Sequence, residues 1–97
     1  MTPKILPAAV ADLEWGREFY DHLEPGIGDY FVQSAFADIE SLRLYGGIHG
    51  KRFGFHWVLV TRFPWAIYYD MEDGLPVVHR VLDCRAHPDT HRKALTE

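Results

Sequence analysis

The sequence is poor in cysteine, in long apolar runs and in positive charge, and each shortage excludes a class of protein. Cys84 is the only cysteine among the 97 residues, so no internal disulfide can form and a zinc site built on thiolates is not expected. No apolar run approaches the roughly 20 residues that a transmembrane helix needs. A carboxylate, Asp12, comes too early for a secretion signal. We therefore expect a cytoplasmic protein without membrane contacts.

Positive charge is scarce in one half of the chain in particular. The formal net charge is −4, which argues against a generic binder of nucleic acid or another polyanion. Residues 1–50 carry three basic and eight acidic side chains, whereas residues 51–97 carry seven basic and six acidic ones. Solvated helix faces account for the acidic half, and any anion-binding surface is expected in the second half.

What the sequence does contain is enough apolar material for one small core. Hydrophobic residues make up 47% of the chain and aromatic residues 14%. This aromatic fraction supplies bulk for a core and leaves rings that could be exposed to a partner. A length of 97 residues suits one domain, which we expect to span residues 1–97.

The first half has the periodicity of two helices. Residues 8–23 place apolar side chains three and four residues apart, after a proline that suits a first helical turn. Residues 24–28 interrupt this pattern with proline and glycine. A second helix is predicted over residues 29–45, with Asp29 as its N-cap and Gly46 and Gly47 as its end. The short linker predicts an antiparallel helical hairpin.

The second half alternates with a period of two, which indicates strands over residues 55–62, 65–71 and 77–84. Short turns join them, so an antiparallel meander is predicted; a short strand before the first helix is also allowed. The expected class is α+β, with the helical hairpin packed on one sheet face and the other face partly open. The polar tail, residues 88–97, is expected to form one helical turn or to fray.

Four strings resemble the RelE/ParE family of toxins and occur in the family's order. The strings are Ala9-Val10-Ala11-Asp12-Leu13, Pro25-Gly26-Ile27-Gly28 followed by Phe31, Arg62-Phe63-Pro64-Trp65-Ala66-Ile67-Tyr68-Tyr69, and Val81-Leu82-Asp83-Cys84-Arg85-Ala86-His87-Pro88. They correspond to the family's A-x-x-D-L, P-G-L-G-x-x-F, R-F-P-Y-x-I-Y-Y and final strand with R-R-D-P. The chain departs from the last string, because Ala86 and His87 replace an arginine and an aspartate. Asp83 also stands where the family frequently has a histidine.

The resemblance implies the toxin component of a type II toxin–antitoxin system, which inhibits growth until a cognate ParD- or RelB-like antitoxin neutralises it. ParE-like members, which include plasmid stabilisation toxins, inhibit DNA gyrase, and the strings at residues 25–28 and 62–69 resemble that branch more. Two alternatives stay open: a RelE-like endonuclease that cuts mRNA on the ribosome, and an inactive relative that serves as a protein-binding module. Whether the chain is an enzyme is therefore undecided. No cofactor and no metal are expected.

Candidate site residues come from the sheet and its turns. Partner contacts are expected at Arg52, Arg62, Tyr68, Arg80 and Arg85. For an RNA endonuclease, the acid, base and phosphate-binding groups would be Arg62, His79, Arg80, Arg85 and His87.

Structural roles compete with these assignments. Arg62 and Arg80 could instead pair with carboxylates of the sheet or helices, and His79 could be a hydrogen-bonded sheet histidine. Tyr68 is expected to be exposed, because its neighbours Ile67 and Tyr69 share the opposite face. His87 and His91 have the spacing of helical metal ligands, but Pro88 lies between them and a third ligand is missing.

Overall fold

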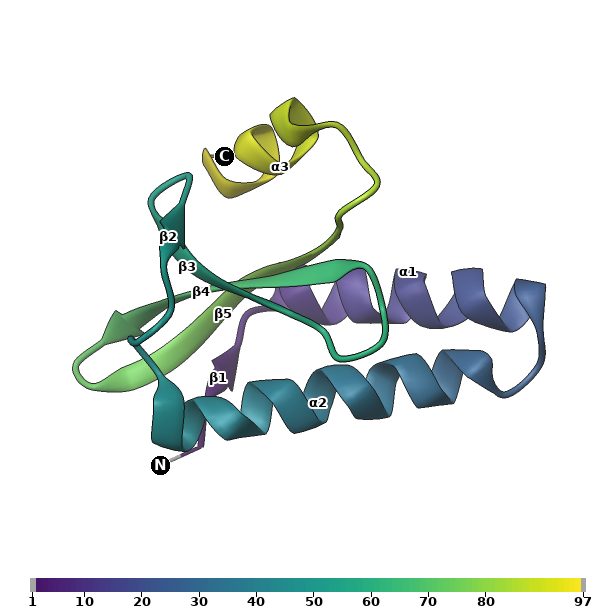
Figure 1. Ribbon diagram of the computed structural model, residues 1–97, viewed down its shortest axis with the longest axis horizontal. Coiled ribbons are helices and arrows are strands. Elements are labelled where there is room, and N and C mark those ends of the chain that lie inside the picture. Colours follow the sequence, from purple (N-terminus) through teal and green to yellow (C-terminus); the bar gives the residue numbers. More distant parts are fainter. Residues whose placement is uncertain (1, 97) are drawn as a thin grey trace.

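The computed structural model describes residues 2–96, in which a helical hairpin covers one face of a five-stranded sheet (Figure 1). The strands are β1 (Lys4–Ile5), β2 (Lys51–Arg52), β3 (Phe55–Leu59), β4 (Trp65–Glu72) and β5 (Leu75–Asp83), and the helices are α1 (Pro7–Leu23), α2 (Ile27–Tyr45) and α3 (Pro88–Thr96). Their order in the sheet is β1-β5-β4-β3-β2. The predicted α+β class is confirmed. No helix within residues 2–96 is long and apolar enough to cross a membrane.

The predicted meander is the centre of this sheet, and a short strand extends it at each edge. Strands β3, β4 and β5 pair antiparallel, β2 adds to β3 in the same sense, and β1 pairs with β5 in parallel. Strand β3 ends earlier than predicted, at Leu59. Beyond it the backbone amide and hydroxyl of Thr61 donate to the carboxylate of Asp38 in α2, 2.7 and 3.0 Å away, and Arg62 adopts a left-handed φ of 70°.

The main core lies between the helical hairpin and the sheet. The sheet contributes Ile67, Tyr69, Val78 and Val81, all fully buried, and the helices contribute Ala9, Leu13, Phe31, Ala35, Ile39 and Leu42. These helical residues recur at spacings of three and four, so each helix presents one apolar stripe to the sheet. Burying each large side chain contributes about 1.5–3 kcal/mol, which makes this layer the principal source of stability.

Glycines let the two hairpin helices approach closely. A Cβ atom at Gly16 would lie 2.4 Å from the Phe31 ring, and one at Gly28 would lie 2.3 Å from the backbone oxygen of Arg17. The predicted N-cap at Asp29 is wrong, since α2 already begins at Ile27. Its first turn is capped from α1, because Asp21 Oδ1 accepts from the amides of Gly26 and Gly28, at 3.2 and 2.8 Å.

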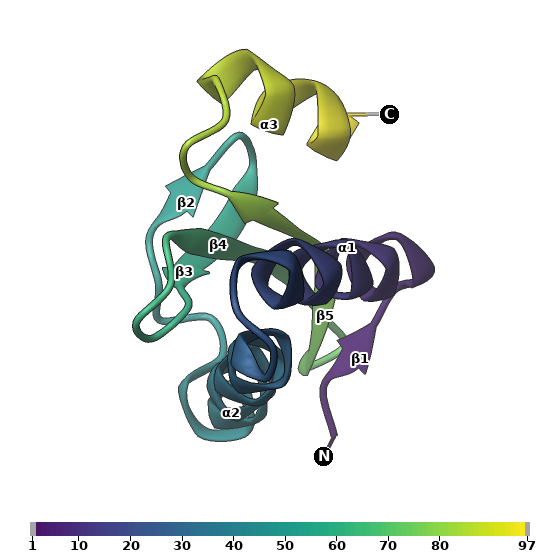
Figure 2. The ribbon, with the colours of Figure 1, turned by 90° about the vertical axis from the view of Figure 1, so that its right-hand side faces the viewer.

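The other sheet face is partly covered, and this differs from the expectation for the polar tail. Residues Pro88–Thr96 form the nine-residue helix α3, which lies on the side of the sheet opposite the hairpin (Figure 2); Glu97 lies outside the described residues. Leu95 packs with Ala66 and Tyr68 in a second, smaller cluster. The sequence conceals this helix because only Leu95 and His91 of its residues are buried.

Substituting Gly28 tests the close approach of the helices. Gly28→Ala should lower the free energy of unfolding by about 1–3 kcal/mol, because the new methyl group meets a backbone oxygen that cannot move aside cheaply. Gly50→Ala is the matched control, since a Cβ atom there meets nothing within 4 Å. Urea denaturation of both variants measures the difference, and equal stability of the two would contradict the proposed packing.

Candidate functional site

Arg80, a predicted partner and catalytic residue, is engaged inside the molecule. Its Nε and Nη2 atoms donate to the two carboxylate oxygens of Asp12 in α1, at 2.7 and 2.8 Å. The same carboxylate accepts the backbone amide of Val81 at 3.0 Å. Strand β1 pairs with β5 only at Val77 and Val78. Beyond β1, the Asp12 carboxylate accepts the backbone hydrogen bond of β5 that a neighbouring strand would otherwise accept. Arg80 therefore has the structural role that the sequence left open, in which it pairs with a carboxylate of a helix.

Tyr68 is buried, so the expectation that its side chain is exposed is wrong. Its side chain does project to the face opposite Ile67 and Tyr69, but α3 covers it there and leaves it 0% exposed. Its hydroxyl lies 2.9 Å from His91 Nδ1, and His91 Nε2 lies 2.7 Å from the backbone oxygen of Asp83. Because a carbonyl only accepts, Nε2–H donates to Asp83, and in the neutral imidazole the hydroxyl of Tyr68 then donates to Nδ1. Burial raises the pKa of Tyr68.

His87 precedes α3 and His91 lies within it, and three of their four ring nitrogens already have hydrogen-bond partners. Both nitrogens of His91 take part in the contacts with Tyr68 and Asp83. His87 is exposed, and its Nδ1 accepts the backbone amide of Asp89 at 3.0 Å. A buried, doubly hydrogen-bonded His91 cannot also serve as a metal ligand, so this histidine pair forms no metal site.

Arg85, the leading candidate, is half-exposed and held in place. Its Nε and Nη2 atoms donate to the carboxylate of Asp83 at 2.9 and 2.7 Å, and its guanidinium lies 5.3 Å from the centre of the Phe19 ring. Burial raises the pKa of the Asp83 carboxyl, but the hydrogen bonds from Arg85 outweigh it and leave that pKa below its ordinary value. The remaining exposed guanidinium edge is therefore presented at a fixed position.

The other predicted arginines lie at separate places. Arg62 sits in the loop between β3 and β4, where its guanidinium donates to the hydroxyl of Tyr30 in α2. Arg52 is exposed in β2, and its guanidinium lies 5.0 Å from the Phe53 ring and 5.9 Å from the Trp57 ring. Both positions leave these cations accessible to a partner.

Two groups of rings, which the residue patterns do not single out, lie beside Arg62 and Arg85 and are connected through the buried ring of Tyr20. Rings of α1, α2 and the β3–β4 loop stack or meet edge to face at the end of the sheet where these arginines lie. We call this surface the aromatic end; its residues are Trp15, Phe19, Tyr30, Arg62, Phe63 and Arg85. Trp15 is 58% exposed and Tyr30 is 40% exposed. The sequence did indicate one of these exposed rings, because Trp15 falls outside the stripe of buried residues on α1.

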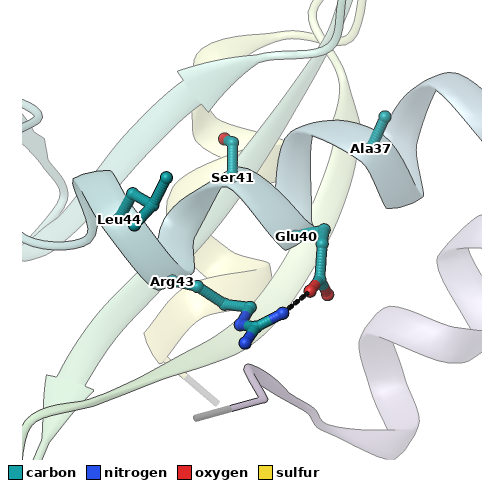
Figure 3. Close-up of a pocket in the computed structure, with 5 residues that line it drawn as sticks. All are labelled: Ala37, Glu40, Ser41, Arg43 and Leu44. Atoms are coloured by element: carbon teal, nitrogen blue, oxygen red, sulfur yellow. Dashed lines mark hydrogen bonds and ion pairs between the residues drawn. The ribbon is translucent and has the colours of Figure 1, made fainter.

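Two of the surface depressions do not resemble an active-site cleft, whereas a third brings His79 and Arg80 together beside Leu95. One of them runs along the outer face of α2, where Ala37, Ser41 and Leu44 lie beside the 2.7 Å ion pair of Glu40 with Arg43 (Figure 3). Another lies between α1 and α2 and is lined by Val10, Leu13, Glu14, Arg17, Val32 and Phe36. Neither depression brings together a base and several cations, the arrangement that RNA cleavage would need.

Comparison with known proteins identifies the fold. No family model matches the sequence, and no curated protein matches it. A solved structure does match: a chain of the chromosomal ParDE TA system from P. aeruginosa aligns with a TM-score of 0.76, at 19% identity, over 86% of this chain and 95% of that one. The chain has the fold of this ParDE component. The resemblance to the RelE/ParE family is therefore confirmed at the level of the fold.

Removing Asp12 tests whether the ParDE-like fold depends on its contact with β5. Asp12→Ala removes two charged hydrogen bonds to Arg80 and one to Val81, so the free energy of unfolding should fall by about 2–4 kcal/mol. Asp89→Ala is the matched control, because it removes an exposed ion pair with Arg92 that contributes about 0–1 kcal/mol. Thermal and urea unfolding of both variants provide the comparison. Similar losses would show that the Asp12 contact is dispensable.

Proposed function

We propose that this chain is a single-domain toxin of a type II toxin–antitoxin pair, which inhibits growth through DNA gyrase until an antitoxin neutralises it. The observation that carries the proposal is the fold shared with a chain of a ParDE system over 86% of this chain. The strings at residues 25–28 and 62–69, which resemble the ParE-like branch, support the same assignment. Fold alone is a weak guide to function, so the features of the surface have to agree with it.

The aromatic end supports an antitoxin partner. Tryptophan, tyrosine and arginine are the residue types that carry most binding energy at protein interfaces. Here Trp15, Tyr30, Arg62 and Arg85 lie together and are held by ring stacking and hydrogen bonds, so little side-chain entropy is lost when a partner binds. A standard interface would take about 800 Å² of the 5824 Å² surface, which an extended antitoxin segment can cover.

Gyrase inhibition is preferred to RNA cleavage because of how the candidate catalytic residues are placed. Arg80 is bound to Asp12, His79 lies beside two carboxylates, and Arg62 contacts Tyr30. Cleavage of RNA needs an acid, a base and cations directed at one phosphate. Because Arg80 and Arg62 are held by separate partners in α1 and α2, their placement favours a function that depends on protein contacts.

Expression of the chain with and without its genomic neighbour tests the proposal. Expression alone should arrest growth with DNA-damage signalling, and purified protein should inhibit supercoiling by gyrase. Co-expression with an antitoxin encoded next to it should restore growth. Messenger RNA cut on ribosomes would instead indicate the endonuclease, and benign expression with retained binding would indicate an inactive binding module. Either result would contradict the proposal.

A substitution at the aromatic end tests the surface separately. Trp15→Ala should weaken antitoxin binding at least about tenfold, because an exposed tryptophan in such a cluster is a typical hot spot. Ile48→Ala is the matched control, since Ile48 is 73% exposed and lies outside the aromatic end. Calorimetric titration gives both affinities, and circular dichroism verifies folding. Equal affinities would place the antitoxin elsewhere.

A further inference from the structure

Three ligand-type side chains meet near the turn between β4 and β5. Asp70 and Glu72 stand two residues apart on β4, so they project from the same sheet face, and His79 faces them from β5. His79 Nε2 lies 3.2 Å from Asp70 Oδ1 and 3.6 Å from Glu72 Oε2. One potential ligand atom from each of the three residues lies within 4.8 Å of the other two.

Two of these atoms have no hydrogen-bond partner. Asp70 Oδ1 and His79 Nε2 are both buried as atoms, and neither makes a hydrogen bond within residues 2–96, although they are only 3.2 Å apart. A buried polar atom without a partner is unfavourable by about 1–3 kcal/mol. At 3.2 Å the two atoms are close without forming a hydrogen bond, whereas a cation coordinated by both would satisfy both.

Two of the three separations between ligand atoms match a coordination sphere. Ligand atoms about 2.0–2.2 Å from a tetrahedral zinc ion stand about 3.4 Å from one another, and the two measured separations are 3.2 and 3.6 Å. We propose that Asp70, Glu72 and His79 bind one divalent first-row transition-metal ion of the Zn²⁺ type, with water completing the coordination. The imidazole nitrogen favours such an ion over Mg²⁺ or Ca²⁺, which prefer oxygen ligands alone.

A β-bulge supplies the third ligand. The pairing of β4 with β5 shifts between Tyr68 and Tyr69, so that Tyr68 pairs with Arg80 and Tyr69 with Val78. His79 is the extra residue, and bulges of this kind commonly re-aim a side chain at a functional site. The Phe55 ring, 4.8 Å from the imidazole, limits its rotation and keeps Nε2 directed at the carboxylates.

This inference departs from the sequence expectation of no metal, and it does not depend on the proposed function. The expectation considered Cys84 and the pair of His87 with His91, whose spacing is visible in the chain. A ligand set that joins two strands across a bulge has no such signature. Bound metal would fasten the end of the β4–β5 hairpin through side chains of both strands.

Zinc titration of the tag-free protein tests the site. Calorimetry or competition with a chromophoric chelator should give one Zn²⁺ per chain, and the melting temperature should rise with Zn²⁺ concentration. Asp70→Asn, Glu72→Gln and His79→Gln should each weaken binding at least about tenfold, since each removes a ligand. Glu72 is exposed, so its variant should fold normally even where Asp70→Asn is less stable.

Two variants serve as matched controls. Asp73→Asn removes a charge from the turn of the same hairpin, and His87→Gln removes an exposed imidazole; both should bind Zn²⁺ within about twofold of the unmodified chain. Absence of one-to-one binding, or unchanged affinity in Glu72→Gln and His79→Gln, would overturn the proposal. Equal stabilisation by Mg²⁺ would overturn the assignment to a transition metal.

Discussion

The contact of Asp12 with β5 is the constraint on which the arrangement of helices and sheet depends. One carboxylate receives two hydrogen bonds from Arg80 and one from the Val81 amide, and thereby fixes α1 against the edge of β5 beyond β1. The apolar stripes of α1 and α2 then pack on four sheet residues, Ile67, Tyr69, Val78 and Val81. Because Asp12 is 13% exposed and Arg80 27% exposed, this pair is shielded from solvent more than an ordinary surface ion pair.

The two sheet faces consequently have different roles. One carries the large core beneath α1 and α2 (Figure 1), and the other carries a smaller cluster that α3 closes through Leu95 and the contact of His91 with Tyr68. Trp15 and Tyr30 stay exposed at the aromatic end, beside Arg62 and Arg85. The surface proposed for the antitoxin therefore lies where α1, α2 and the β3–β4 loop meet.

The residue patterns in the sequence predicted the helices and strands that depend on neighbouring residues. Apolar spacing gave both hairpin helices, alternation gave β3, β4 and β5, and the family-like strings gave the fold. Three features depend on contacts between different helices and strands and escaped prediction. Asp21 caps α2 from the preceding helix, so Asp29 is not needed as N-cap; α3 is held by two buried residues only; and the bulge at His79 changes which side chains share a face. Arg80 was found as a candidate, but its partner Asp12 is 68 residues away.

Hydrogen–deuterium exchange of the chain, alone and with the antitoxin encoded by its genomic neighbour, tests the central claim most directly. Antitoxin binding should slow exchange in the second half of α1, the start of α2 and the β3–β4 loop, where the aromatic end lies, and should leave α3 unchanged. Slower exchange confined to the sheet face beneath α3, or faster exchange throughout α3 as if it were displaced, would contradict this account of the partner surface.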